Sequence, residues 1–259
     1  MSAIVLKNAD EIVLMRQSGK LLAQVFEMLE DVVKPGVSTL EINDRAEEYI
    51  VSELKSRPAS KGQYGFKFAL NTSVNEVVCH GIPDQTRKLN STDIINVDIT
   101  LEKDGFIADS STTFVLPNAS RAAQKLVKTT YKAMWAGIKQ VRPGARLGDV
   151  GAAIQQVAET AGYSIVKDYC GHGIGRDMHE GPSVMHFGKK GTGILLKEGM
   201  TFTIEPMVNA GTELTVTKED GWTVETLDRK LSAQWEHTVL VTSDGYEVLT
   251  LRPDERIPG

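Results

Sequence analysis

A loose internal repeat is the feature that most limits how this chain can fold. Four short segments recur in the same order in the first and second parts of the sequence. The pairs are Val33-Lys34-Pro35-Gly36 with Val141-Arg142-Pro143-Gly144, Leu40 with Leu147, Cys79-His80-Gly81-Ile82 with Cys170-Gly171-His172-Gly173-Ile174, and Asp98 with Glu205. This order predicts two αα–ββ halves packed about a pseudo-twofold axis. A shared site is expected between the halves, where their polar residues meet.

Helical and strand patterns within each half give the expected fold class. Apolar residues recur at helical spacing from Asp10 to Val33, and a Pro-Gly pair then ends the helix. Ser38, with Glu41 three residues later, predicts a capping box at the start of a second helix. We therefore expect a mixed α/β (α+β) fold. Its single domain covers residues 1–259, with internal halves at approximately 10–117 and 118–251.

Composition excludes several classes of protein. With 259 residues and 41% hydrophobic content, the chain can bury a full core. The net charge of −5 and the lack of a basic run argue against nucleic acid as a primary partner. No apolar run approaches the roughly 18–20 residues of a membrane span, and no signal peptide is evident. Cys79 and Cys170 form no CxxC pair, so we expect a reduced, cytoplasmic protein.

A predicted β-hairpin between residues 94 and 116 contains the first two candidate acidic residues, Asp98 and Asp109. Two β-rich runs flank the turn sequence Lys103-Asp104-Gly105. Aspartate is depleted in the interior of strands, yet Asp98 lies between Val97 and Ile99. This placement suggests that Asp98 has a role other than stabilising the strand.

The register of this hairpin decides whether Asp98 meets Asp109. A two-residue loop would pair Asp98 with Ser111 and leave Asp109 one diagonal step away on the same face. A four-residue loop would place the two aspartates directly opposite, and a three-residue loop without a bulge would separate them. The first two registers bring the carboxylates to within roughly 4.5–8 Å. At that distance, like charges require either a proton or a bound cation.

Three further residues complete a candidate metal site. Glu205 ends one apolar strand and Glu236 leads into another, and an acid in such a place is costly unless it is paired or binds metal. His172 lies between two glycines that allow close approach of a ligand. Together with Asp98 and Asp109, the acids would carry about four negative charges, which two divalent cations would neutralise. A bridging carboxylate can hold two such ions roughly 3.5–4 Å apart, as in two-metal hydrolases.

At several motifs the chain resembles the type I methionine aminopeptidases. These enzymes have the pita-bread fold, which is shared with aminopeptidase P, prolidase and creatinase. The resemblance covers nearly the whole chain, and the short spacing between Glu205 and Glu236 leaves no room for the helical insertion of type II enzymes. The absence of an N-terminal extension indicates the bacterial-like form. The motifs are Asn75-Glu76-Val77-Val78-Cys79-His80-Gly81-Ile82-Pro83, Val97-Asp98-Ile99-Thr100, Asp109-Ser110-Ser111, Gly171-His172-Gly173-Ile174-Gly175, Thr203-Ile204-Glu205-Pro206-Met207 and Trp235-Glu236-His237-Thr238.

The resemblance implies a ligand set that the charge argument had reached separately. Asp109 and Glu236 would bridge two divalent ions, Asp98 would bind one ion, and His172 with Glu205 the other. Oxygen-rich ligands with one imidazole suit Co, Mn or Fe, and Zn or Ni remain open.

The resemblance also implies a reaction and its partners. The enzyme would remove the N-terminal methionine of nascent polypeptides when the second residue is small, by attack of a hydroxide that two metal ions activate. Glu205 would carry the proton of the attacking water, and His80 and His179 would hydrogen-bond the scissile amide. A monomer with transient ribosome association is expected.

The substrate pocket is the place where the chain departs from the family pattern. The resemblance assigns the methionine side chain to Phe66, Met178 and Trp222, beside His80 and His179. The family usually has Tyr and Cys residues where this chain has Gln63, Phe66 and Asn71, and Phe where it has Met178. Selectivity for methionine is expected, but its strictness stays open. A monovalent cation site is implied near Asn75, Val77 and Ser232.

Several other functions are compatible with the same residues. A different pita-bread metallopeptidase, such as an X-Pro aminopeptidase or dipeptidase, is the principal alternative. A non-catalytic binding protein on the same fold is another, although no metal ligand is missing. A cysteine hydrolase using Cys79 and His80 is disfavoured, because neighbouring strand residues point to opposite faces. His186 and His237 are expected to be structural or surface residues rather than ligands.

Overall fold

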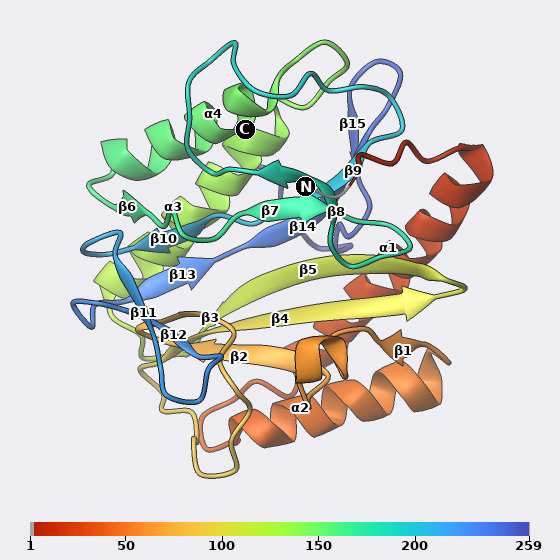
Figure 1. Ribbon diagram of the computed structural model, residues 1–259. Helices are drawn as coiled ribbons and strands as arrows, with labels where there is room; N and C mark the ends of the chain where they lie inside the picture. Colours follow the sequence, from red (N-terminus) through yellow and green to blue (C-terminus); the bar gives the residue numbers. More distant parts are fainter. Residues whose placement is uncertain (1–2, 259) are drawn as a thin grey trace.

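A curved antiparallel sheet with helices on its outer side forms the body of the molecule (Figure 1). The computed structural model describes residues 3–258. The helices are α1 (Ala9–Glu30), α2 (Thr39–Glu48), α3 (Arg121–Ile138) and α4 (Leu147–Thr160), with a π-helical turn at Tyr49–Glu53 and a 3₁₀ turn at Gln63–Gly65. The expected mixed α/β architecture is confirmed.

The main sheet joins strands from both parts of the chain. Its order is β1 (Arg57–Pro58), β4 (Ile94–Lys103), β5 (Phe106–Val115), β14 (Glu236–Val241), β9 (Thr201–Ile204), β7 (Gly171–Gly173) and β8 (Glu180–Val184), with β2 (Leu70–Val74) on β4 and β15 (Tyr246–Val248) on β14. The junction lies between β5 and β14, where Ser111 pairs with Glu236. This pairing brings the acidic segments of the two parts together.

Two small sheets flank the main one. The first contains β13 (Ser232–Gln234), β10 (Met207–Asn209) and β6 (Ser164–Ile165), and the second contains β11 (Thr215–Thr217), β12 (Val224–Thr226) and β3 (Val77–Cys79). The second sheet connects residues that are far apart in sequence, since Val224 pairs with Cys79. It therefore holds the β11–β12 hairpin beside the strand that leads to His80.

Each helix pair covers its own part of the sheet and encloses a separate core. Side chains of α1 and α2, including Phe26 and Ile42, pack with those of β4, including Val97. Side chains of α3 and α4, including Trp135, pack with those of β9, including Phe202. Both cores are buried and apolar, so they can hold the polar face of the sheet in a fixed geometry.

The helix starts agree with the sequence except in one detail. Ser38 caps α2 by accepting a hydrogen bond from the amide of Glu41 at 3.1 Å. Among the described residues, the reciprocal bond from Glu41 that would complete a capping box is absent, so that part of the prediction was wrong. A full capping box occurs instead between Asn8 and Glu11 at the start of α1.

The β4–β5 hairpin adopts the first of the predicted registers. Asp104 and Gly105 form a two-residue turn with φ of 52° and 81°, which an Asp-Gly pair tolerates well. Asp98 pairs with Ser111, and Asp109 lies opposite Thr100. Since residues two apart share a face, both carboxyl groups point to the same side of the sheet.

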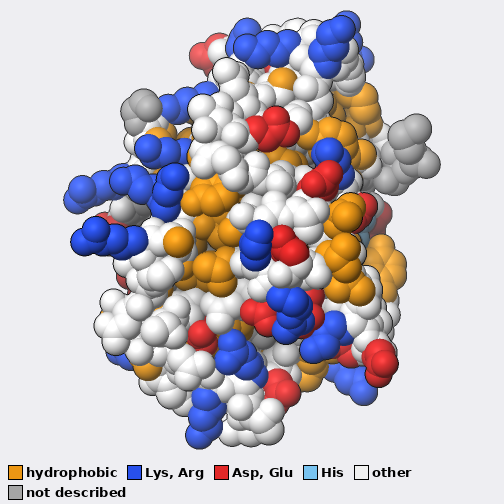
Figure 2. Space-filling model, turned by 90° about the vertical axis from the view of Figure 1, so that its left-hand side faces the viewer, with side chains coloured by type: hydrophobic (Ala, Val, Ile, Leu, Met, Phe, Trp, Pro, Cys, Tyr) orange, Lys and Arg blue, Asp and Glu red, His pale blue; other side chains and the backbone are white. Residues whose placement is uncertain are grey.

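No helix within residues 3–258 is both long and apolar enough to cross a bilayer. On the face drawn in Figure 2, Lys and Arg gather at the left-hand edge and the top and also lie across the lower centre. Asp and Glu are interspersed with them, and apolar side chains are exposed near the middle.

Candidate active site

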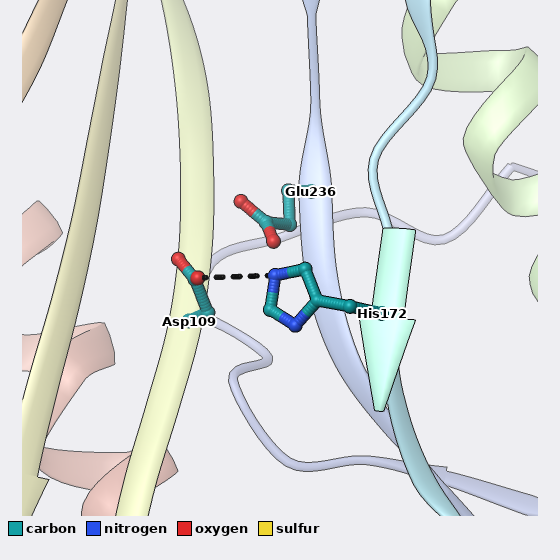
Figure 3. Close-up of side chains that lie close together, drawn as sticks. All are labelled: Asp109, His172 and Glu236. Atoms are coloured by element: carbon teal, nitrogen blue, oxygen red, sulfur yellow. Dashed lines mark ion pairs between the residues drawn. The ribbon is translucent and has the colours of Figure 1, made fainter. Parts of the chain in front are cut away.

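Three of the predicted ligands converge at the centre of the main sheet (Figure 3). Asp109 comes from β5, Glu236 from the start of β14 and His172 from β7, and one ligand atom of each lies within 4.8 Å of the others. The Nε2 atom of His172 is 3.8 Å from Oδ2 of Asp109. Two carboxylates and one imidazole at this spacing can coordinate a single divalent cation.

The other two predicted ligands line the same cavity, which has a volume of about 470 Å³. Glu205 follows β9, and its Oε1 atom lies 3.6 Å from Nε2 of His172. Asp98 lines the cavity as well, and it pairs with Asn71 across β2 and β4. The structure therefore brings all five residues to one place.

Burial shifts the pKa values of the four acids and of His172 away from their ordinary values. Desolvation is the main cause that raises the pKa of Asp98 to about 6 and that of Glu205 to about 8. Desolvation, followed by repulsion between the acids, holds the pKa of Asp109 and Glu236 well above the usual range. Burial also lowers the pKa of His172 to about 4. At neutral pH, His172 is therefore neutral and available as a ligand. Asp109, Glu205 and Glu236 retain protons that a cation would displace, whereas Asp98 is largely ionised.

One unsatisfied atom indicates that the site fits a cation. The buried Oδ1 atom of Asp109 has no hydrogen-bond partner among the described residues. Such an atom is costly in a protein interior unless a ligand satisfies it. Together with the oxygen-rich donor set, it favours a divalent metal.

Neighbouring hydroxyl groups fix the strands that carry the ligands. Thr238 accepts from the amide of Asp109 at 3.1 Å and donates to its carbonyl at 2.8 Å. Ser110 donates to the carbonyl of Glu236 at 2.7 Å. Thr203 accepts from the amide of His172 at 2.9 Å and donates to Glu205 at 2.7 Å. These contacts are the outer-shell support that metal ligands usually have.

The tautomer of His172 follows from its other ring nitrogen. Nδ1 lies 3.0 Å from the carbonyl of Gly173, which can only accept a hydrogen bond. Nδ1 therefore carries the proton, and Nε2 presents its lone pair to the carboxylates. This is the orientation that metal coordination requires.

Two more histidines border the cavity, as the sequence predicted. The ring of His179 lies 4.4 Å from that of His172, centroid to centroid. Its Nδ1 atom is 3.3 Å from the hydroxyl of Tyr64. His80 packs edge-on against Tyr169 with a centroid distance of 5.6 Å.

An apolar pocket adjoins the carboxylates. Phe66 packs against Trp222 with a centroid distance of 5.0 Å, and Met178 is buried nearby on the cavity wall. Gln63 and Asn71 line the same cavity and make its wall partly polar. The predicted pocket residues are thus gathered at one site.

Tyr64 and Tyr169 are cavity residues that sequence reasoning missed. Tyr64 stacks on His179 and has a positive φ of 50° in a turn with Gly62 and Gly65. The glycines were the only local signal that this segment makes an unusual turn.

Cys79 and His80 lie at the same cavity, although the sequence predicted that they would face opposite sides of a strand. Both Cys79 and His80 line the cavity, because β3 ends at Cys79 and His80 has a positive φ of 56°. The argument from alternating strand faces was therefore wrong. Burial, however, raises the pKa of the Cys79 thiol well above its usual value, which disfavours a thiolate nucleophile.

His186 and His237 are fully buried and are not among the described residues that line the cavity. Nε2 of His186 accepts a hydrogen bond from the amide of Glu205 at 3.1 Å. His237 lies between Thr250 and Glu255, at 2.9 Å from each. His186 therefore supports the backbone of Glu205, whereas His237, which follows Glu236, is bonded to two side chains of the C-terminal segment.

The residues predicted to hold a monovalent cation lie on or next to β3 and β13. The carbonyl of Asn75 accepts from the amide of Ser232 at 2.8 Å, and Val77 begins β3. The buried hydroxyl of Ser232 has no hydrogen-bond partner within residues 3–258.

The curved sheet and its buried cluster of acids with one imidazole define a metallopeptidase with the pita-bread fold. The model of metallopeptidase family M24 matches residues 13–243. The methionine aminopeptidase of Escherichia coli strain K12 is 48% identical over 256 residues, covering 99% of this chain and 97% of its own length. The chain belongs to the methionine aminopeptidases of family M24, and membership of this metallopeptidase family implies that it binds divalent metal.

Solved structures agree with this assignment. The crystal structure of the methionine aminopeptidase from Rickettsia prowazekii superposes with a TM-score of 0.94 at 46% identity, covering 96% of this chain and 100% of that chain. The corresponding enzyme from Thermotoga maritima gives a TM-score of 0.93 at 38% identity, covering 96% of this chain and 99% of that chain. The predicted resemblance, fold and enzyme class are confirmed.

Proposed function

We propose that this chain removes the N-terminal methionine from polypeptides whose second residue is small, using two divalent ions. The observation that carries the proposal is the convergence of Asp98, Asp109, His172, Glu205 and Glu236 in one buried cavity. An apolar pocket lies directly beside it, as an exopeptidase with a side-chain preference requires.

The ligands would divide between the two ions according to their positions. Asp109 and Glu236 lie centrally and would bridge, Asp98 would bind one ion, and His172 with Glu205 the other. Bound divalent ions supply Lewis acidity and lower the pKa of water. The free amine of the substrate would lie near Asp98, which explains a restriction to N-termini. The donor set suits Co, Mn, Fe, Zn or Ni without selecting among them.

Glu205 is the proposed proton carrier of the reaction. Its carboxyl group is oriented by Thr203 at 2.7 Å and by the side-chain amide of Gln234 at 3.3 Å. Its pKa of about 8 in the metal-free protein shows that it binds a proton readily near neutral pH. Glu205 would accept the proton of the attacking water and transfer it to the leaving amine.

We propose that His179 and His80 form hydrogen bonds with the scissile amide of the substrate. Burial lowers the pKa of both histidines, so each would be a neutral hydrogen-bonding group at pH 7. Donors placed where charge develops stabilise the transition state more than the ground state. Tyr64, stacked on His179, would narrow the mouth through which the second residue passes.

Phe66, Met178 and Trp222 would hold the methionine side chain. Methionine is a flexible, polarisable residue, so Met178 can adapt to a thioether in the pocket. Gln63 and Asn71 place polar groups on the wall, so the strictness of this preference has to be measured. We further propose a monovalent cation near Asn75, Val77 and Ser232, and a cytoplasmic monomer that meets nascent chains at the ribosome.

A peptide panel tests the proposal against its alternatives. Hydrolysis of Met-Gly, Met-Ala and X-Pro peptides is measured with and without added divalent metal. Metal-dependent cleavage of the methionine peptides alone is the expected result. Preference for X-Pro peptides would identify another pita-bread peptidase, and metal-dependent binding without cleavage would identify a non-catalytic relative.

A further inference from the structure

A short segment near the start of the described residues, 3–7, lies across the loop that carries His179. We call residues 3–7 the N-terminal strap. The amide of Gly181 donates to the carbonyl of Ala3 at 3.2 Å, and the amide of Lys7 donates to the carbonyl of Gly199 at 2.8 Å. In Figure 1 the start of the chain lies beside β7 and β8, in the second half of the molecule. The strap therefore joins distant parts of the sequence, since Lys7 and Glu180 are 173 positions apart.

A buried ion pair fastens the strap to this loop. Lys7 pairs with Glu180, and their side chains are only 1% and 7% exposed. Lysine and glutamate are almost never this buried unless they are paired. By contrast, the ion pair of Arg16 with Glu247 is 41% and 36% exposed, as is usual for a surface contact.

Glu180 also organises the loop through its second oxygen. Oε1 accepts hydrogen bonds from the amides of Arg176 at 3.0 Å and Asp177 at 3.5 Å. The loop that precedes β8 therefore folds around this carboxylate. Lys7 neutralises the charge that these contacts bury.

Gly175 gives independent support for the importance of this pair. A Cβ atom at Gly175 would overlap the side chains of both Lys7 and Glu180. A side chain at the last glycine of the Gly-His-Gly-Ile-Gly motif would thus displace the ion pair from its present position. The motif therefore leaves room for the ion pair of the loop, in addition to carrying His172.

We propose that Lys7 is a positioning residue that acts through Glu180 to place His179 and Met178 in the active-site cavity. His179 directly precedes Glu180, and its ring lies between His172 and the exposed ring of Tyr64. The Glu180 carboxylate accepts from the amides of Arg176 and Asp177, on the other side of Met178 and His179 in the chain, and so closes the loop that carries both side chains. The inference rests on the proposed function, in which His179 hydrogen-bonds the scissile amide.

The test compares Lys7→Met with Lys7→Arg and with the control Arg16→Met, all in the metal-loaded full-length enzyme with Met-Ala-Ser as substrate. Lys7→Met should lower kcat about tenfold or more, because small misplacements of a catalytic group are costly. Metal content should be unchanged, Lys7→Arg should recover most of kcat, and Arg16→Met should match the wild type. Glu180→Gln, which keeps the shape of the side chain, should lower kcat in the same way if Lys7→Met does not fold.

A double-mutant cycle separates positioning from general stability. In the His179→Ala background, Lys7→Met should change kcat less than about twofold, since coupled residues do not act additively. An equal fold-loss in both backgrounds, or no loss from Lys7→Met and Glu180→Gln, would overturn the inference alone. If His179→Ala itself left kcat unchanged, the proposed role of His179 would fail and the inference with it.

Discussion

Nε2 of His172 lies 3.6 Å from Oε1 of Glu205, yet the two side chains do not form an ion pair at neutral pH. Burial lowers the pKa of His172 to about 4 and raises that of Glu205 to about 8. Between these values both groups are neutral in the metal-free protein. Coordination of a cation would favour the deprotonated carboxylate and leave the imidazole neutral, so the site is arranged for metal rather than for an ion pair.

The metal-free protein should lose stability as the pH rises from about 7 to 9, above the range in which the histidines of the unfolded chain titrate. The pKa values of Asp98 and Glu205, about 6 and about 8 in the folded chain, exceed their ordinary values of 3.8 and 4.5. In this range the unfolded chain has released more protons than the folded chain, so the free energy of unfolding falls with pH. Thermal unfolding with chelator present should show a decreasing Tm, and added metal should reverse the trend. A Tm that rises with pH under chelation would contradict this reading of the site.

Asp109→Asn should reduce metal binding and yet stabilise the metal-free protein. It removes one of four clustered acids that repel one another, and losing that repulsion should raise the free energy of unfolding at pH 8 by about 1–3 kcal/mol. Metal content should fall together with activity. Denaturant unfolding with and without metal measures both effects, with Asp244→Asn on the surface as the control. Lower stability of the metal-free variant would argue against the proposed clustering of charge.

His179→Ala should lower kcat roughly 100-fold or more, the usual scale for losing a transition-state hydrogen-bond donor. Metal content, measured by elemental analysis, should not change, because His179 is proposed to contact the substrate only. Loss of metal in this variant would make His179 a ligand and the assignment of roles incorrect.

The second residue of the substrate should be restricted by the mouth of the cavity near Tyr64 and His179. Met-Ala-Ser should be cleaved at least about 100-fold faster than Met-Lys-Ser, which is about 2.7 kcal/mol in the barrier. Exclusion by steric clash can exceed the roughly 1–3 kcal/mol that a missing methylene provides. Values of kcat/KM for both peptides decide the point, with Leu-Ala-Ser as the control for the methionine pocket. Equal values for the first two would mean that the mouth is open.

The sequence predicted those parts of the site that depend on local structure. The Asp-Gly turn fixes the β4–β5 register and so places Asp98 and Asp109 on one face. Acids within apolar strands identified Glu205 and Glu236, because such residues are costly without a partner.

Contacts between distant segments could not be predicted in the same way. The pairing of Lys7 with Glu180 and the stacking of Tyr64 on His179 depend on how separate segments pack, which no local pattern encodes. His80 shows a related limit, since its positive φ turns it out of the strand and places it beside Cys79 on the cavity wall.

The most direct test of the central claim is a metal titration of the exhaustively chelated enzyme. Activity on Met-Ala-Ser and bound metal per chain are measured together as Co, Mn, Fe, Zn or Ni is added back. We predict no activity without metal, recovery on addition, and binding that reaches two ions per chain and is reduced by Asp109→Asn. Full activity in protein shown by elemental analysis to contain no metal would contradict the account.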